Sequence, residues 1–454
     1  MAAGGPTTDT APQRRRAKSA LFAIGCGWAG LAPHWLDPSL SLIPAITLAV
    51  LLGGYSVRSV LLPALRPASV PPVPVPPAPD PWPAVDVVVA ARDEEAVIGR
   101  LVERISEVRY PAGLLTLWVV DDASSDRTPA VLAELKGRFP FLQVLRRESE
   151  AGGGKSGALN DVLAQLKARW MLVLDADADL QSDTLERLIG YAEAGGWSAV
   201  QLRKAEVNAS ANWLTKLQAM EMALDAVIQQ GRLATAGVAE LRGNGQLLRR
   251  DALLACGGFN EATVTDDLDL SFRLLIGQQP IGLLWNPPVQ EEAVLTLHAL
   301  WRQRQRWAEG GLQRFFDYAP QLLSSRLSGA QKWDLACFFL LQYALPVVAI
   351  ADLVGALITA TLPTIWPLSV VAFGLSGVSI VVGCRRPSEG PALPAINPLS
   401  LLLGIAYLGH WFVVIPYTTL RMALLPKRLV WAKTLHLGEE SSDGVAAQED
   451  PATA

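Results

Sequence analysis

The sequence predicts an α/β domain with a doubly wound, mixed but mostly parallel sheet, flanked by transmembrane helices and an interfacial helix. The chain has 454 residues, and 50% of them are hydrophobic, which is too apolar for an ordinary soluble enzyme. Between residues 84 and 290, expected strands alternate with amphipathic helices, as in a parallel sheet covered on both faces. Within this region the run WMLVLDADAD, residues 170–179, predicts a buried strand that ends in three carboxylates.

The first 83 residues divide into three expected parts. Residues 1–19 form a basic tail. The apolar runs 20–36 and 40–62 are each near the length that crosses a bilayer core of about 30 Å, so 20–62 is expected to hold two transmembrane helices. A cleaved signal peptide is the alternative for the first run. The second run favours a helical hairpin with its basic end in the cytosol, and residues 63–83 form a proline-rich, extended linker.

The α/β domain is expected to begin with four strands joined by three helices. The strands are 86–91, 115–120, 142–145 and 171–174, and the helices are 94–108, 125–139 and 155–168. Right-handed crossovers place the carboxyl ends of parallel strands on one rim of the sheet. Ligands of open α/β sheets bind at that rim.

The residues after the α/β domain predict an interfacial helix and further transmembrane helices. Residues 291–330 include an Arg- and Trp-rich amphipathic stretch expected to lie at the membrane surface. Three apolar runs follow within 331–425, and transmembrane helices are favoured over buried core helices because of their length. The tail 426–454 has a disordered acidic end. Two spans before the domain and three after it would put Lys427, Arg428 and Lys433 outside, against the positive-inside rule, so one run is re-entrant or the count is wrong.

The carboxylates Asp175, Asp177 and Asp179 are the first candidate site. Carboxylates crowded at the end of a strand repel one another unless a cation lies between them. Hard oxygen ligands suit Mg²⁺ or Mn²⁺ that shares its coordination shell with the phosphates of a substrate. The alternative is a solvated acidic turn before the next helix. The four scattered cysteines show no metal-binding spacing, and nothing indicates nucleic-acid binding.

Two further motifs follow the second and third strands. Asp121 and Asp122 end the second strand, where a simple helix cap by a following serine competes with contact to a nucleobase. Gly152–Lys155 opens a helix, and glycines, a helix N-terminus and a lysine together suit a diphosphate. A Walker A loop is excluded, because that pattern needs glycine where Ser149 stands.

Two motifs lie nearer the C-terminus. Asp266 and Asp267 precede a helix, where carboxylates often only offset the helix dipole, but one near the rim can take a proton from an attacking hydroxyl. Gln303, Arg306 and Trp307 share one helix face. They suit phosphate binding and a flat wall for a sugar, or alternatively a plain amphipathic helix.

Taken in order, these motifs resemble the inverting family-2 glycosyltransferases that are built into membranes. The signatures are DDxSxD, a lysine-glycine-asparagine loop, DxD, a TED-like element and QxxRW, over roughly residues 84–330. The resemblance implies a GT-A type fold, a UDP-sugar donor and a divalent cation, Mg²⁺ or Mn²⁺. It implies the following roles: uracil contact by Asp121 or Asp122, nucleotide binding by Lys155 and Asp175, metal binding by Asp177, the catalytic base at Asp267, and the QxxRW site at Gln303, Arg306 and Trp307. Asp266 departs from the usual glutamate of TED.

Segments 153–160, 242–246 and 305–314 are similar to those of the cyanobacterial β-monoglucosyldiacylglycerol synthases. That similarity implies transfer of glucose from UDP-glucose to diacylglycerol by a multi-pass membrane protein with a cytosolic catalytic domain. A processive polysaccharide synthase shares the same motifs and is the first alternative. A non-catalytic membrane scaffold is the second.

Overall fold

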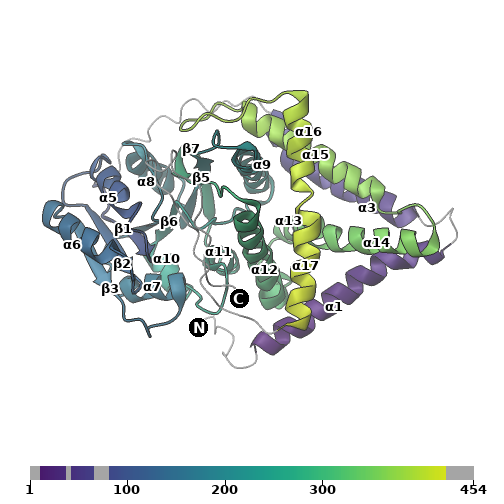
Figure 1. Cartoon of the computed structure of the whole chain (residues 1–454), viewed down its shortest axis with the longest axis horizontal. Coiled ribbons are helices and arrows are strands. Elements are labelled where there is room, and N and C mark those ends of the chain that lie inside the picture. The colour runs from purple at the N-terminus through teal and green to yellow at the C-terminus, as the bar shows by residue number, and fades with distance from the viewer. Residues whose placement is uncertain (1–10, 37–41, 66–80, 426–454) are drawn as a thin grey trace.

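The computed structural model describes residues 11–36, 42–65 and 81–425. Figure 1 shows a sheet domain at one end and a bundle of long helices that converge at the other. Most of the expected linker, residues 66–80, and the expected tail 426–454 lie outside the described residues.

One seven-stranded sheet forms the core of the first part, in the order β3-β2-β1-β4-β6-β5-β7. The strands are β1 (Val85–Ala91), β2 (Leu115–Asp121), β3 (Leu142–Arg146), β4 (Trp170–Leu174), β5 (Ala199–Glu206), β6 (Gln246–Arg249) and β7 (Ile281–Glu291). Every pairing is parallel except those of β6, which runs antiparallel to β4 and β5. This confirms the predicted mixed, mostly parallel sheet.

Helices cover both faces of the sheet because strand side chains alternate between faces. Val85, Val87 and Val89 pack with residues of α5 (Ile98–Ser106), α6 (Thr128–Arg138) and α8 (Thr184–Ala194). Val88 and Ala90 pack on the opposite face with α7 (Gly154–Leu163), α10 (Arg250–Ala255) and α11 (Asp266–Ile276). The three predicted helices are shorter than expected, since α5 begins at Ile98, α6 begins at Thr128 and α7 ends at Leu163.

The second part is helical. It consists of α1 (Ala11–Leu31) with the short turn η1 (Ala32–Trp35), α3 (Ile43–Ser56) with η2 (Val57–Leu61) and α4 (Leu62–Leu65), α13 (Gly329–Phe339) with η3 (Leu340–Ala344) and α14 (Leu345–Thr359), α15 (Trp366–Arg385), α16 (Pro398–Leu408) and α17 (Trp411–Leu424). Two further long helices, α9 (Trp213–Ala236) and α12 (Leu297–Leu322), lie between the sheet and the bundle (Figure 1).

Four helical stretches in the described chain are long and apolar enough to cross a membrane: Ile43–Leu61, Gly329–Thr359, Trp366–Arg385 and Pro398–Leu424. The first of the five predicted spans, 20–36, is not among them. Helix α1 begins at Ala11, inside the expected basic tail 1–19. Its basic side chains have partners on α12, where Arg15 forms an ion pair with Asp317.

The amphipathic stretch expected within residues 291–330 contains α12, and three aromatic residues of this helix lie inside the protein. Phe315, Phe316 and Tyr318 are buried. Phe315 packs edge-on against Phe272 of the sheet domain, with ring centroids 4.9 Å apart. These three rings therefore belong to the interior of the protein. Through Phe315, α12 packs against Phe272 of the sheet domain and Phe339 of the helical bundle.

Candidate active site

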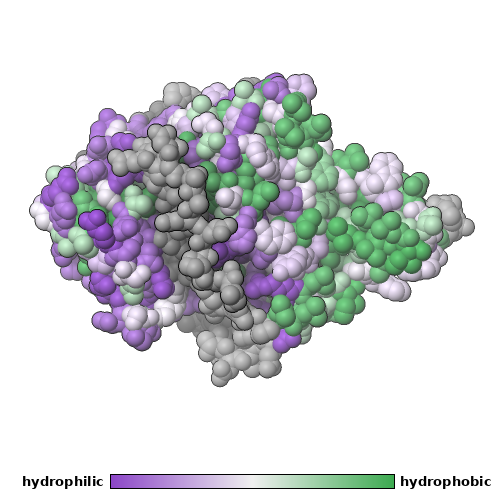
Figure 2. Space-filling model, viewed as in Figure 1, coloured by the Kyte–Doolittle hydropathy of each residue, from purple (hydrophilic) through white to green (hydrophobic). Residues whose placement is uncertain are grey.

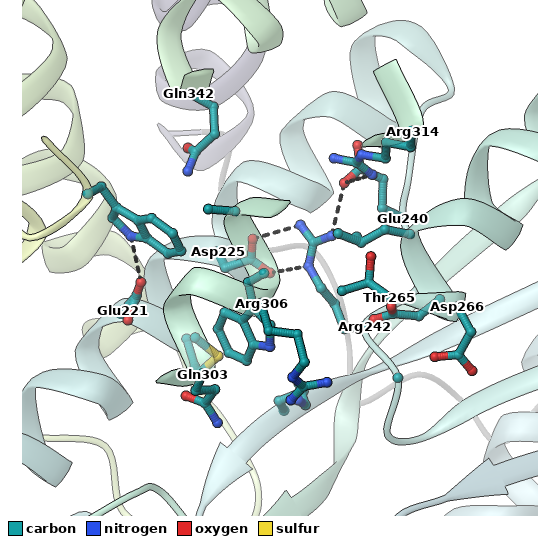
Figure 3. A pocket seen from close by; sticks show the side chains of 18 of the residues that line it. Glu221, Asp225, Glu240, Arg242, Thr265, Asp266, Gln303, Arg306, Arg314 and Gln342 are labelled. Atoms are coloured by element: carbon teal, nitrogen blue, oxygen red, sulfur yellow. Dashed lines mark hydrogen bonds and ion pairs between the residues drawn. The ribbon is translucent and has the colours of Figure 1, made fainter. Parts of the chain in front are cut away.

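A cavity of about 830 Å³ lies between the carboxyl rim of the sheet and the helical bundle. Its sheet side is lined by Asp122, Lys155, Asp175, Asp177, Asp266 and Asp267, and α12 contributes Gln303, Arg306 and Trp307. Its bundle side is lined by residues that include Tyr55, Gln342, Pro346, Phe373, Ser376 and Phe412. One cavity therefore has an acidic wall and a largely apolar wall, and Figure 3 shows part of it from close by.

The end of β4 supplies two of the three predicted carboxylates to the cavity. Asp175 forms an ion pair with Lys155 at 2.5 Å, and its backbone N–H donates to the Asn244 side chain. The Asp177 carboxylate accepts from the backbone N–H of Glu292 at 3.1 Å. Asp179 is not a cavity residue, because the chain turns to bridge β7 and its carboxylate lies 3.6 Å from Arg104.

Lys155 stands among carboxylates from distant parts of the chain. Burial alone would lower the pKa of Lys155, but Asp175, then Asp266, and more weakly Asp267, raise it above its ordinary value. The ammonium group therefore stays charged and partly neutralises the acidic wall. The helix that presents it, α7, follows glycines 152, 153 and 154, which all have positive φ. A side chain on Gly153 would also collide with Glu261 and the backbone of Gly157.

Asp267 lies in the first turn of α11, against the loop that carries Gly243. Burial raises the pKa of the Asp267 carboxyl and the neighbouring Asp266 raises it further, while Lys155 and Arg242 oppose them. Gly243 has φ +84°, and a Cβ there would lie 3.4 Å from an Asp267 carboxylate oxygen. Glycine at 243 thus lets the backbone turn close to this carboxylate.

The first acidic pair is divided between two environments. The Asp121 carboxylate is buried and accepts from the backbone N–H of Ser124 at 2.9 Å, and it is not among the cavity-lining residues. Asp122 lines the cavity and pairs with Arg147, which also donates to the carbonyl of Gly152 at 2.7 Å. Arg147 therefore ties the cavity-facing aspartate to the glycine loop.

The QxxRW residues project from α12 into the cavity. Gln303, Arg306 and Trp307 are half-buried and all line it. Within the described residues the Arg306 guanidinium has no hydrogen bond or ion pair. Arg304 instead points away into the protein, where it pairs with Glu221 and lies 4.1 Å from the centre of the Trp307 ring. This buried pair holds the indole in place.

A second set of charged residues was not predicted. Arg242 lies between Asp225 and Glu240 and bonds to both, at 2.9 Å in each ion pair (Figure 3). Burial would raise the pKa of Glu240, but Arg314, Arg232 and Arg242 lower it well below its ordinary value. The sequence did not reveal this set, because its members are far apart in the chain. The signal it offered was charged residues within otherwise apolar helices such as 213–236.

The acidic wall fits a divalent cation that takes most of its ligands from a substrate. The described residues contain no cluster of three or more His, Cys, Asp or Glu side chains arranged for a metal ion. Asp177 nevertheless faces the cavity beside Asp175, and one buried carboxylate oxygen of Asp266 has no hydrogen-bond partner in the described chain. At such sites Mg²⁺ is usually coordinated by one or two protein carboxylates, and phosphate and water oxygens supply the other ligands.

Comparison with known proteins agrees with this arrangement. The model of the family described as "Glycosyltransferase like family 2" matches residues 83–310. The chain is 42% identical to a β-monoglucosyldiacylglycerol synthase of Synechocystis sp., over 96% of this chain and 91% of that protein. It is 46% identical to the synthase of the same name from Trichormus variabilis, over 78% of this chain and 77% of that protein.

A solved structure shares the fold. It is a mannosyltransferase from Pyrobaculum calidifontis in complex with GDP-Man and Mn²⁺, with a TM-score of 0.56 and 20% identity, over 83% of this chain and 99% of that chain. This likeness supports the predicted GT-A type architecture. The family model and the full-length similarity together show that the chain belongs to glycosyltransferase family 2.

Proposed function

We propose that this enzyme transfers glucose from UDP-glucose to diacylglycerol and forms β-monoglucosyldiacylglycerol. The observation that carries the proposal is the single cavity with an acidic wall at the sheet rim and an apolar wall in the helical bundle. A nucleotide sugar needs the first wall and a lipid acceptor needs the second. The relatives named β-monoglucosyldiacylglycerol synthase support this glycolipid product.

On the donor side, Asp122 is the aspartate that faces the cavity, so we assign it rather than Asp121 to the uracil. Arg306 has no partner in the described residues and is available to the diphosphate, with Gln303 on the same face. A planar guanidinium matches phosphate oxygens in two-point hydrogen bonds. Trp307, held by Arg304, offers its ring to the sugar or acceptor.

The reaction is a single displacement with inversion at the anomeric carbon. Asp267 takes the proton of the acceptor hydroxyl, whose oxygen then forms the new bond to the anomeric carbon as the bond to UDP breaks. The electron pair leaves with the diphosphate, which Arg306 and Lys155 stabilise. A divalent cation held by Asp177 would neutralise charge on that leaving group.

The acceptor hydroxyl of diacylglycerol lies near the membrane surface, which sets where the cavity must open. The bundle side of the cavity is formed by α3, α14, α15 and α17, all with lipid-compatible exposed residues. We therefore assign the protein to the membrane as a multi-pass protein. The catalytic domain is on the cytosolic side, where nucleotide sugars are made.

The product identifies the acceptor. Full-length protein in lipid–detergent micelles is given UDP-glucose labelled in the glucose, together with diacylglycerol and Mg²⁺. We expect chloroform-soluble label that a β-glucosidase releases as glucose. Ethanol-insoluble label would instead indicate a processive synthase, and no release of UDP under any condition would indicate a non-catalytic scaffold. Parallel reactions with UDP-galactose test the hexose.

A further inference from the structure

The far end of the helical bundle is marked by a buried polar cluster. His34 lies 3.0 Å from Asp352 of α14 and 2.7 Å from the Thr361 hydroxyl. At the opposite end of α1, Arg15 pairs with Asp317 of α12. Helix α1 therefore runs the whole length of α14, from the catalytic domain to the far end. Its segment 19–31 carries no charge, although α1 is less apolar than the four stretches that are long and apolar enough to cross a membrane.

Helices α3 and α15 return to the catalytic side. After α3, the carbonyl of Ser59 lies against Gly231 of α9, where an added Cβ would be 1.7 Å away. At the end of α15, Gly383 lies against the backbone of Ala223, also on α9. The bundle thus contains four segments that run between the two ends: α1, α3, α13–α14 and α15.

The stretch Pro398–Leu424 does not run between the two ends of the bundle, although it is long enough to cross a membrane. Near its start Gly404 packs against Met220 of α9. In its middle Tyr407 and Trp411 both donate to Glu221, at 3.0 and 2.9 Å.

The end of this stretch is held on the same side. Arg421 pairs with Glu309 of α12 at 3.0 Å, and the carbonyl of Leu424 accepts from Arg16. Polar contacts with α9 and α12 therefore recur along the stretch, which also packs against α1, α14 and α15. Helix α17 runs across α14 rather than along it (Figure 1).

The opposite face of this stretch is apolar and exposed. On α16 the exposed residues are Leu399, Leu402 and Leu403, and on α17 they are Val413, Tyr417, Leu420 and Leu424. Spacings of three and four residues place them on one face of each helix. Figure 2 shows hydrophobic residues gathered over the helical bundle and its border with the sheet domain. Helix α14 also carries exposed leucines, such as Leu357.

We propose that α16 and α17 lie in the plane of the membrane, with this apolar face in the acyl region of the catalytic-side leaflet. The chain then crosses the bilayer four times, through α1, α3, α13–α14 and α15. This inference rests on the proposed membrane location. It places the end of α17, at Leu424, on the catalytic side. Lys427, Arg428 and Lys433, which follow in the sequence, then agree with the positive-inside rule. The proposal thus counts two spans after the catalytic domain, where about three were expected and where three stretches are long and apolar enough to cross a membrane.

Side-specific labelling tests this topology. A membrane-impermeant maleimide is applied to spheroplasts and to inverted vesicles that contain full-length variants with one added cysteine. Glu134→Cys reports the catalytic side, and Leu362→Cys, 85% exposed in the turn after α14, reports the far side. Ala454→Cys reports the C-terminus. The unaltered chain is the background control, since its four cysteines are buried or half-buried.

We expect Ala454→Cys to be labelled in the same preparation as Glu134→Cys, and Leu362→Cys in the other one. Labelling of Ala454→Cys together with Leu362→Cys would overturn the proposal. The pattern does not depend on catalysis, so the same series in an Asp267→Asn background separates this result from a failure of the proposed function. A monodisperse gel-filtration peak in detergent verifies that each variant is folded.

Depth measurements test the in-plane orientation directly. Spin labels at Leu402, Val413 and Leu424 are compared for accessibility to oxygen and to a water-soluble nickel complex. These positions span about 33 Å at a rise of about 1.5 Å per residue. In-plane helices predict similar depths for all three labels. A label at Val413 near the bilayer centre, with the other two near opposite surfaces, would contradict the proposal.

Discussion

At the scale of single residues, the site depends on how acidic groups share one wall of the cavity. Burial and the neighbouring Asp266 raise the pKa of the Asp267 carboxyl, and the positive charges of Lys155 and Arg242 limit that increase. A base that retains its proton more readily than a free aspartate is also a stronger acceptor of a hydroxyl proton. Neighbouring charges thus adjust a residue type that is otherwise a weak base.

Asp267→Asn keeps the shape of the side chain but cannot accept the proton. We expect the transfer rate to fall by at least about 100-fold, as typical for loss of a general base, while UDP-glucose still binds. Initial-rate assays and calorimetric titration of the nucleotide measure the two effects. Asp251→Asn, an exposed carboxylate outside the cavity, is the matched control. Loss of nucleotide binding in Asp267→Asn would contradict the assignment.

Asp266→Asn removes the like charge that raises the pKa of Asp267. The base works only when deprotonated, so activity is lost as the pH falls through the pKa of Asp267. We expect the acid limb of the kcat/KM profile to lie at a higher pH in the unaltered enzyme than an ordinary aspartate predicts. In Asp266→Asn it should move to lower pH. An acid limb that stays in place would show that another group titrates there.

Asp177→Ala removes the carboxylate assigned to the cation. We expect Mg²⁺-dependent binding of UDP to weaken at least tenfold, about 1.4 kcal/mol, while binding without the metal changes little. Asp179→Ala is the control, since that side chain faces Arg104 instead of the cavity. An unchanged metal requirement in Asp177→Ala would rule out this role.

At the scale of elements, two helices join the sheet to the helical bundle. Helix α12 carries the QxxRW residues and packs its rings against both parts, and α9 touches η2 and α15 through close backbone contacts. Gly231 is the tightest of these, since its Cα faces the Ser59 carbonyl. Close backbone contacts at glycines of α9 and α15 therefore fix the position of the helical bundle relative to the sheet rim.

Gly231→Ala would force η2 away from α9. We expect a loss of about 1–3 kcal/mol in the free energy of unfolding, the usual cost of overpacking a tight contact, and a lower transfer rate because the two cavity walls separate. Thermal unfolding in detergent measures the first effect. Gly137→Ala on α6, where a Cβ meets nothing within 4 Å, is the control and should be neutral or stabilising. Equal effects in both variants would contradict the contact.

At the scale of the whole molecule, the proposed function has the donor and the acceptor enter one cavity from water and from the membrane, respectively. Filling its membrane side should therefore affect only the acceptor. For Ala372→Trp, which adds bulk to the cavity wall on α15, we expect the KM for diacylglycerol to rise at least tenfold, with nucleotide binding unchanged. Val370→Trp, which is 60% exposed on the same helix, is the control. A change in nucleotide binding alone would contradict this division of the cavity.

The sequence predicted much of the sheet domain because its strands are continuous apolar runs and its motifs sit at their ends. It placed Asp175, Asp177, Lys155, Asp267 and the QxxRW residues, which the structure brings to one cavity. Helix ends were less well predicted, since contacts in the preceding loops shift them: the Thr128 N–H, at the start of α6, donates to the Asp126 carboxylate of the loop. The charged set around Arg242 was missed, because its partners come from α9, α12 and the loop before β6.

The sequence by itself determined the fold class and the chemical types at the rim, because periodic burial and strand-end motifs are local properties. Only the tertiary structure decided that Asp121 is a buried cap while Asp122 faces the cavity, and that Phe315, Phe316 and Tyr318 are buried. It likewise set the direction of α16 and α17. Hydropathy measures how apolar a helix is, but its orientation follows from polar contacts, such as Arg421 to Glu309, between residues distant in the chain.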